Sequence, residues 1–482
     1  MKNNSNIPKS KIAYSFFWVL TERFGYSAIN LLSTIILARL LSPYEFGLIG
    51  TITIITSISN MLIESGMGAA LVNKKEVTRK DCDTVFTFNL LMSIFFYITI
   101  FAFAPIIANY FEEPILKNVI RVLSLTLVFN AFTVIQRVIL MRKMLFKSQS
   151  LISIVSLIVS VIIAIFAAVN KLGVWAIVIQ LVLYSFTSAV MTISIIKYLP
   201  TIQFSIKSFK ELLGFGGRII LSGVIQVSYS DLISSVISKV YTIQTTGLYT
   251  QSQKLISFPV FFFRSLFDGA AFPILSKAKD KGEFKEMCSR INRGIYFLAF
   301  PMLIVIPFNT KEIIEIILGR EWVEANKIFT ILSIGIIISL IDAATFCTLK
   351  SAGESKTFLT LGTIKAIIGI SVLSVTFLFP IEILLYGIIF TNLTTVAFAI
   401  YYVDQLTLYK TKHQLRDIVF PLMMSFVASG VSLVFSQFIS FDNEIINLLA
   451  FTVLTILIFI TECLLFKIEE VNFVLKKIKI RL

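Results

Sequence analysis

The sequence contains few of the side chains that soluble enzymes use for chemistry and for surface hydration. Of its 482 residues only 15% are charged and only one is a histidine, whereas 56% are hydrophobic. The mean hydropathy of +0.88 is far above that of a domain that folds in water. These shortages exclude an ordinary soluble globular protein and indicate a chain embedded in a membrane.

Several catalytic and cofactor-binding patterns are also missing. The four cysteines lie far apart, which excludes paired-cysteine metal sites and a disulfide framework. The single histidine, His413, lies in a basic loop that the topology below assigns to the cytoplasm, which excludes histidine-based catalysis on the outer face. No G-x-x-x-x-G-K-[ST] pattern occurs, so ATP is not the direct energy source. The sequence predicts no enzyme activity, no bound metal and no cofactor.

Long apolar runs fill the chain instead. Each has about 20 residues, enough to cross about 30 Å of hydrocarbon at about 1.5 Å per residue. The first run passes Glu22 and Arg23 without a small-residue cleavage site, so we expect no removable signal peptide. We predict an all-α, polytopic membrane protein with about fourteen spans, at residues 14–38, 46–66, 84–107, 118–138, 149–169, 173–196, 212–236, 246–272, 288–308, 326–348, 357–379, 382–403, 418–438 and 446–466.

The distribution of basic residues predicts the orientation of these spans. With fourteen spans, 29 of the 43 Lys and Arg residues fall in loops on the side of both termini and eight fall on the opposite side. Basic residues collect in cytoplasmic loops, so we expect both termini in the cytoplasm. The net charge of +15 therefore indicates topology rather than binding to nucleic acid.

Six basic residues remain inside predicted spans, where a charge is costly unless it serves a purpose. A small error in a span boundary moves Arg137 or Lys365 into a basic loop, so we assign these two to topology. The other four are the candidates for binding an anion inside the membrane: Arg23, Arg218, Lys254 and Arg264.

An internal repeat divides the chain. The segment Leu40–Leu48 resembles Val240–Leu248 at an offset of 200 residues, and Gly-Leu opens a polar span in both. A second match aligns Asn118 with Asn326 at an offset near 208. Repeats of this kind are typical of transporters. We predict a lobe at 1–200 with six helices, a second lobe at 201–410 with six more, and two further helices with a basic cytoplasmic tail at 411–482.

The run Leu37-Ala38-Arg39-Leu40-Leu41-Ser42-Pro43-Tyr44-Glu45-Phe46-Gly47-Leu48, followed by Gly66-Met67-Gly68-Ala69-Ala70-Leu71-Val72, resembles the Wzx-like polysaccharide flippases of the MOP exporter superfamily. This group includes exporters of O-antigen, teichuronic acid and colanic acid. Gly247-Leu248-Tyr249 with Lys254-Leu255 is similar to the family's second-lobe version. The resemblance implies two helix bundles around a central cavity, alternating access, and an isoprenoid-diphosphate-linked oligosaccharide as cargo in a bacterial cytoplasmic membrane.

Such a cargo needs cations in a wet cavity, because Arg and Lys form charge-assisted bonds with phosphate oxygens. Arg23, Arg218, Lys254 and Arg264 are therefore the expected diphosphate ligands. The acids inside or near spans either bind a coupling Na⁺ or proton or pair with these cations; they are Glu22, Glu64, Asp231, Asp268 and Asp342. Membrane lipids and a polysaccharide polymerase are the expected partners.

Three alternatives stay open. Arg264 and Asp268 lie four residues apart, so they can neutralise each other on one helix face. A multidrug antiporter of the same superfamily has the same fold, although cationic drugs favour acidic cavities. A membrane polymerase or ligase is the third alternative, but its acceptor site needs a larger external loop than the longest one here, from Phe308 to Ala325.

Overall fold

A computed structural model describes residues 9–64, 66–438, 441 and 443–468, and every regular element within these residues is a helix. The side chains of some helical residues, among them Arg23, Glu64 and Arg218, lie outside the description. The predicted all-α class is confirmed. The chain packs as two compact units, Met1–Thr250 and Gln251–Leu482, which we describe separately.

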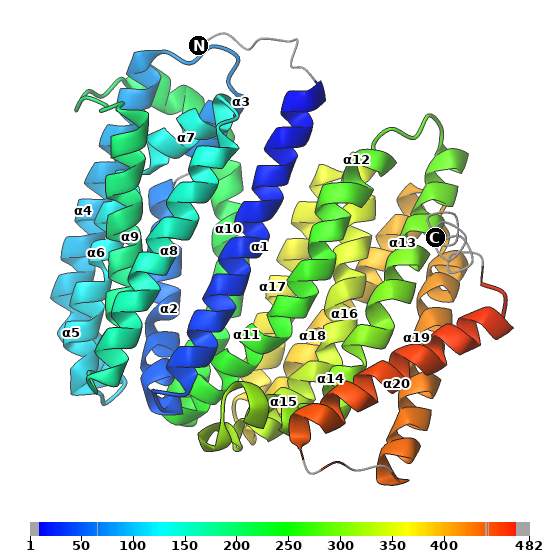
Figure 1. The fold of residues 1–482 in the computed structure, drawn as a ribbon. Helices are drawn as coiled ribbons and strands as arrows, with labels where there is room; N and C mark the ends of the chain where they lie inside the picture. The colour runs from blue at the N-terminus through cyan, green and yellow to red at the C-terminus, as the bar shows by residue number, and fades with distance from the viewer. Residues whose placement is uncertain (1–8, 65, 439–440, 442, 469–482) are drawn as a thin grey trace. The chain divides into compact units, whose positions relative to one another are not determined.

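Within its described residues, the first unit contains ten helices and the start of an eleventh. Figure 1 shows their arrangement. These are α1 (Lys9–Ala38), α2 (Pro43–Glu64), α3 (Met67–Asn73), α4 (Arg79–Tyr110), α5 (Pro114–Leu123), α6 (Leu125–Ala131), α7 (Val134–Arg142), α8 (Phe146–Val169), α9 (Val174–Ile196), α10 (Ile206–Val240) and the first turns of α11 (Ile243–Leu266). Within this unit α8 packs along α9 and α1, and α2 packs along α10.

The second unit begins within α11. It continues through the π-helical turn η1 (Phe267–Ala271), α12 (Phe272–Leu275), α13 (Lys281–Leu303), α14 (Val305–Phe308), α15 (Thr310–Ile317), the short 3₁₀ turn η2 (Arg320–Trp322), α16 (Ala325–Ser351), α17 (Ser355–Thr376), α18 (Ile381–Leu406), α19 (Thr411–Phe438) and α20 (Glu444–Leu465). Here α18 packs along both α16 and α17, and α19 packs along α13 and α20.

Apolar surface holds the helices together and also covers their outer faces. Leu48, Leu127 and Val178 belong to one fully buried core of the first unit, and Phe297, Ala428 and Phe459 to a core of the second. Large apolar side chains such as Phe166 and Leu457 remain exposed on the helix surfaces. Extensive exposed apolar surface on long helices is what a lipid environment requires.

Most predicted spans correspond to single helices, although 118–138 is divided among α5, α6 and α7. The protein is a multi-pass membrane protein. Within the described residues, eleven helices are long and apolar enough to cross a membrane, and two shorter apolar helices lie at Phe24–Ala38 and Thr360–Thr376. The total of about fourteen spans stays a prediction. The lobe boundary at residue 200 also stays a prediction, because the division at Thr250 follows packing rather than the sequence repeat.

Candidate functional site

The second unit brings two membrane-embedded cations close to one acid. Asp342 on α16 lies 4.0 Å from the Lys365 ammonium on α17, measured from Oδ2 to Nζ. Arg264 on α11 lies within electrostatic range of the same carboxylate. We call these three residues the Asp342 cluster. It joins two residues expected from the sequence with Lys365, which the sequence analysis assigned to topology.

The Asp342 carboxylate is only partly satisfied. Its Oδ1 atom is buried and has no hydrogen-bond donor, and the ammonium distance of 4.0 Å is too long for a direct hydrogen bond. Arg264 is exposed, whereas Lys365 is half-buried. Two cations beside one carboxylate leave a net positive charge, and the arrangement can accept an anion with several oxygens.

The depth of Lys365 was the signal that sequence reasoning undervalued. Residue 365 lies ten positions after the start of α17 at Ser355, which at about 1.5 Å per residue is about 15 Å along the helix. A shift of a few residues in the span boundary does not move it into a loop.

A second polar group forms inside the first unit. Glu22 on α1 accepts hydrogen bonds from Ser153 Oγ at 2.9 Å and from Gln149 Nε2 at 3.3 Å, both on α8. The Tyr184 ring on α9 packs edge-on against the Tyr26 ring, with centroids 5.9 Å apart, and lies beside Ser153. We call Glu22, Tyr26, Gln149, Ser153 and Tyr184 the Glu22 group.

Arg137 also belongs with this group. It is half-buried on α7 and lies within electrostatic range of both Tyr26 and Tyr184. The sequence analysis assigned it to topology, because a small error in the span boundary would move it into a basic loop. The Glu22 group offers hydroxyl and amide groups beside one acid and one cation, a set suited to hydrogen-bonding sugar hydroxyls.

The other expected residues lie on α10, α11 and η1, or their side chains lie outside the description. Lys254 is exposed on α11, and Asp231 is half-buried on α10. Asp268 is exposed in η1, whose π-helical turn changes the spacing along the helix after Arg264. The ion pairs of the described residues join Asp342 to Lys365 and do not join Arg264 to Asp268. The side chains of Arg23, Arg218 and Glu64 lie outside the described residues.

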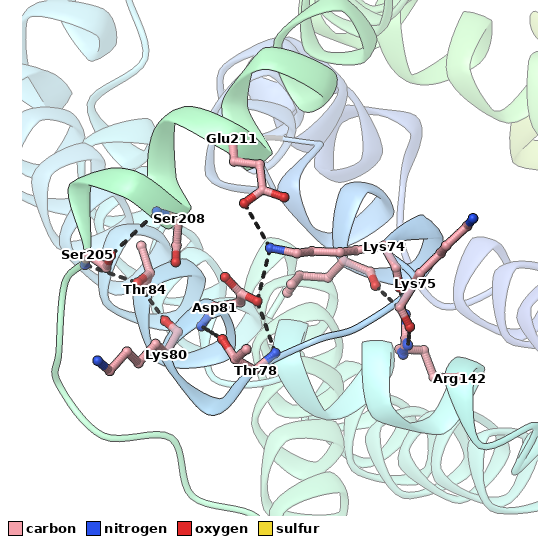
Figure 2. Close-up of polar contacts among 11 residues, drawn as sticks. Lys74, Lys75, Thr78, Lys80, Asp81, Thr84, Arg142, Ser205, Ser208 and Glu211 are labelled. Atoms are coloured by element: carbon pink, nitrogen blue, oxygen red, sulfur yellow. Dashed lines mark hydrogen bonds and ion pairs between the residues drawn. The ribbon is translucent and has the colours of Figure 1, made fainter. Parts of the chain in front are cut away.

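A contrasting polar cluster lies at the end of the first unit where α3, α4, α7 and α10 meet (Figure 2). Lys74 Nζ contacts Glu211 at 3.0 Å and Asp81 at 3.2 Å. Partial burial works to lower the pKa of Lys74, but hydrogen bonds to Glu211 and Asp81 outweigh it and hold that pKa above its ordinary value. Asp81 also forms a reciprocal cap with Thr78 at the start of α4.

Arg142 completes this cluster, which we call the Lys74 cluster. Its guanidinium donates to the carbonyl oxygens of Leu71, Val72 and Lys74 at 2.6–3.1 Å and to that of Lys75 at 3.2 Å. Leu71 and Val72 lie in the last turn of α3, where carbonyls lack helical partners, and Lys74 and Lys75 lie in the loop that follows. The cluster therefore holds a helix end and a loop in place.

Comparison with known proteins identifies the family. A family described as polysaccharide biosynthesis protein matches residues 36–327, more than half of the chain. The chain belongs to this family. The resemblance to polysaccharide flippases found in the sequence is confirmed.

Curated relatives are distant but cover much of the chain. The teichuronic acid biosynthesis protein TuaB of Bacillus subtilis (strain 168) is 21% identical over 320 residues, 66% of each protein. The succinoglycan biosynthesis transport protein ExoT of Rhizobium meliloti (strain 1021) is 23% identical over 356 residues, 73% of this chain and 71% of ExoT. The match with TuaB thus spans just under two thirds of that protein.

Solved structures share the fold of this chain. The lipid II flippase MurJ in an inward closed conformation superposes with a TM-score of 0.76 at 17% identity, over 94% of this chain and 99% of MurJ. An inward-facing multidrug resistance MATE family transporter of the MOP superfamily gives a TM-score of 0.61 at 12% identity, over 79% of this chain and 95% of that one.

Proposed function

We propose that this protein is a flippase, not an enzyme, that moves an isoprenoid-diphosphate-linked oligosaccharide from the cytoplasmic to the outer leaflet for surface polysaccharide synthesis. Family membership supports this function. So do the names of relatives that act in teichuronic acid synthesis and in succinoglycan transport. The structural similarity to the lipid II flippase MurJ also supports it, because the two chains share a fold.

The observation that carries the proposal is the excess of positive charge in the Asp342 cluster. A charge within the membrane costs several kcal/mol unless water, a partner or a ligand offsets it. Asp342 offsets only part of the charge of Arg264 and Lys365, because its closest ammonium contact is 4.0 Å. A diphosphate supplies the oxygens that complete the coordination of both cations.

In the proposed mechanism, the cations line a central cavity that opens alternately to each side. Arg23, Arg218 and Lys254 join Arg264 in binding the diphosphate, while the isoprenoid tail stays in lipid. A Na⁺ or proton gradient drives the cycle through one or more acids, chosen from Glu22, Glu64, Asp231, Asp268 and Asp342. In this scheme Asp342 replaces the diphosphate as counter-ion when the cargo is absent.

The proposed setting is the bacterial cytoplasmic membrane, with both termini in the cytoplasm. The basic loops predicted on that side support this orientation. On the outer face, the flipped precursor passes to a polysaccharide polymerase, which makes that machinery the expected protein partner.

Complementation tests the function. The chromosomal gene is deleted, and surface polymer and lipid-linked intermediates are compared for the wild type, Arg264→Ala and Lys365→Ala at matched expression. The control is Lys327→Ala, since Lys327 is an exposed lysine ion-paired with Glu382. We expect the deletion and both cluster variants to lose surface polymer and to trap the precursor on the cytoplasmic leaflet.

A different outcome identifies the main alternative. Normal polymer after deletion, together with increased sensitivity to cationic drugs, rejects the flippase and supports a multidrug antiporter, which the MATE likeness of the fold also accommodates.

A further inference from the structure

Two helices begin at matching positions of the sequence repeat. α2 begins at Pro43 and α11 at Ile243, an offset of 200 residues. A side chain caps each start: Glu45 Oε2 accepts from Ser42 N at 2.9 Å, and Thr242 Oγ1 accepts from Thr245 N at 3.0 Å. All of these residues lie in the unit Met1–Thr250.

The two helix starts touch through a reciprocal pair of glycines. A Cβ atom added to Gly47 would lie 1.8 Å from the carbonyl oxygen of Ile243, and one added to Gly247 would lie 1.8 Å from that of Pro43. Each glycine therefore packs on the first carbonyl of the opposite helix. No flexible side chain intervenes, so only glycine permits this approach of backbone to backbone.

Tight packing continues one turn further along both helices. A Cβ atom on Gly50 would lie 2.8 Å from Thr250 Cγ2. On the adjacent α10, Ser238 Oγ accepts a hydrogen bond from Thr51 Oγ1 at 2.7 Å, and Ser235 Oγ donates to the Thr51 carbonyl at 2.9 Å. Thr51 is fully buried. The contact is closely packed.

The two helix starts can separate without leaving a backbone carbonyl unsatisfied. In an α-helix the carbonyl of residue i accepts from the amide of residue i+4, so Pro43 and Ile243 each have an acceptor role within their own helix. Separation of α2 from α11 leaves neither carbonyl without a partner. Among the described residues 43–51 and 243–250, no ion pair joins α2 to α11, so none has to break when the two helices separate.

We propose that Gly47 and Gly247 are positioning residues for transport: they form a seal at the outer ends of α2 and α11 that closes in one half of the cycle and parts in the other. The inference rests on the proposed function, because a seal that opens each cycle presupposes alternating access. A larger side chain at either position keeps the seal from closing.

Cysteine labelling tests the seal without any cargo. Thr250→Cys places a thiol one turn inside the crossing, and a membrane-impermeant maleimide is applied to intact cells. The background thiols are all buried. We expect Gly47→Ala and Gly247→Ala each to increase labelling several-fold. Gly430→Ala is the matched control, since an added Cβ there meets no atom within 4 Å.

A cross-link provides an independent test. In the Thr51→Cys/Ser238→Cys variant, oxidation joins α2 to α10 beside the crossing. Residue 238 lies only five positions before α11 begins at Ile243, so the link also holds the start of α11 against α2. We expect oxidised protein to lose transport and reduced protein to regain it. Unchanged labelling in both alanine variants, or full transport by the cross-linked protein, overturns the proposal. If the alanine variants do not fold, the cross-link alone decides it. Labelling is independent of the cargo, so a failed flippase assignment is distinguishable from a failed seal.

Discussion

The Lys74 cluster and the Asp342 cluster use similar side chains in opposite ways. In the first, Lys74 has carboxylate partners at 3.0 and 3.2 Å, and Arg142 donates to four backbone carbonyls. In the second, the closest ammonium–carboxylate contact is 4.0 Å, and Asp342 Oδ1 has no donor. The charges of the Lys74 cluster are paired within the protein, whereas the Asp342 cluster keeps an oxygen without a donor and an excess of positive charge.

The difference indicates which charges are structural. A charged group that satisfies several backbone carbonyls is needed for the fold. A buried charge without sufficient partners destabilises the fold, and its presence is explained by a ligand that completes it. Substitutions in the two clusters should therefore separate stability from transport.

The largest expected effect is the loss of transport in Arg264→Ala and Lys365→Ala. Loss of a charged donor to the cargo diphosphate costs about 1.5–3 kcal/mol per hydrogen bond, which corresponds to about tenfold weaker cargo binding or more. Transport per folded molecule is measured in reconstituted vesicles, and melting temperature serves as the control. Normal transport in both variants would show that the Asp342 cluster does not bind the cargo.

Arg142→Ala should lower the stability of the protein without lowering its transport activity. Four carbonyl oxygens lose a charged donor, so we expect a loss of about 1.5–3 kcal/mol of stability, seen as a lower melting temperature and lower abundance. Transport per folded molecule should stay at the wild-type level. The neighbouring exposed Lys143 provides the control, Lys143→Ala. If Arg142→Ala abolished transport without altering stability, the distinction between the clusters would be wrong.

Asp342→Asn tests the Asp342 cluster through its affinity for an anionic ligand. Removing the resident counter-ion frees Arg264 and Lys365 for an anion, so we expect a soluble isoprenyl diphosphate to bind about threefold to tenfold more tightly, equivalent to about 0.6–1.4 kcal/mol. Isothermal titration in detergent measures this change. Weaker binding would mean that Asp342 organises the site rather than competing with its ligand.

The smallest effect is expected for Glu211→Gln. Its ion pair with Lys74 is largely solvent-exposed, and Lys74 keeps its second partner, Asp81. Exposed pairs contribute about 0–1 kcal/mol, so the melting temperature should change little. The change should be smaller still in high salt, because salt screens the pair. A shift as large as that of Arg142→Ala would show that the Lys74 cluster acts as one cooperative unit.

Hydropathy predicted the helices well where a span is uniformly apolar. The predicted span 382–403 corresponds to α18, Ile381–Leu406, and 149–169 corresponds to α8, Phe146–Val169. Length and apolar composition determine these segments because lipid leaves the backbone no hydrogen-bond partners other than its own.

Local hydrogen bonding limited the prediction elsewhere. The predicted span 118–138 is divided among α5, α6 and α7. At the breaks, Ser124 and Thr133 donate to the carbonyls three residues before them, and such bonds compete with the regular helical pattern. The π-helical turn after Leu266 was likewise invisible, because no residue type marks it reliably.

The sequence predicted which types of residue form the candidate site, but it did not predict every residue in it. Counting charges inside spans found Arg264 and Asp342, but contacts between distant helices added Lys365. The repeat at Gly47 and Gly247 was visible in the sequence, yet only the structure shows that each glycine faces the start of the other helix. Sequence spacing reports neighbours along one helix and carries little information on neighbours across helices.

The most direct test of the flippase proposal is a reconstituted leaflet assay. Purified protein is placed in vesicles with an isoprenoid-diphosphate-linked oligosaccharide, and an impermeant reagent measures how fast the sugar appears on the opposite leaflet. The proposal predicts rapid transfer by the wild type and by Lys327→Ala, with little transfer by Arg264→Ala and Lys365→Ala. Transfer at equal rates by all four proteins, or by none, would contradict it.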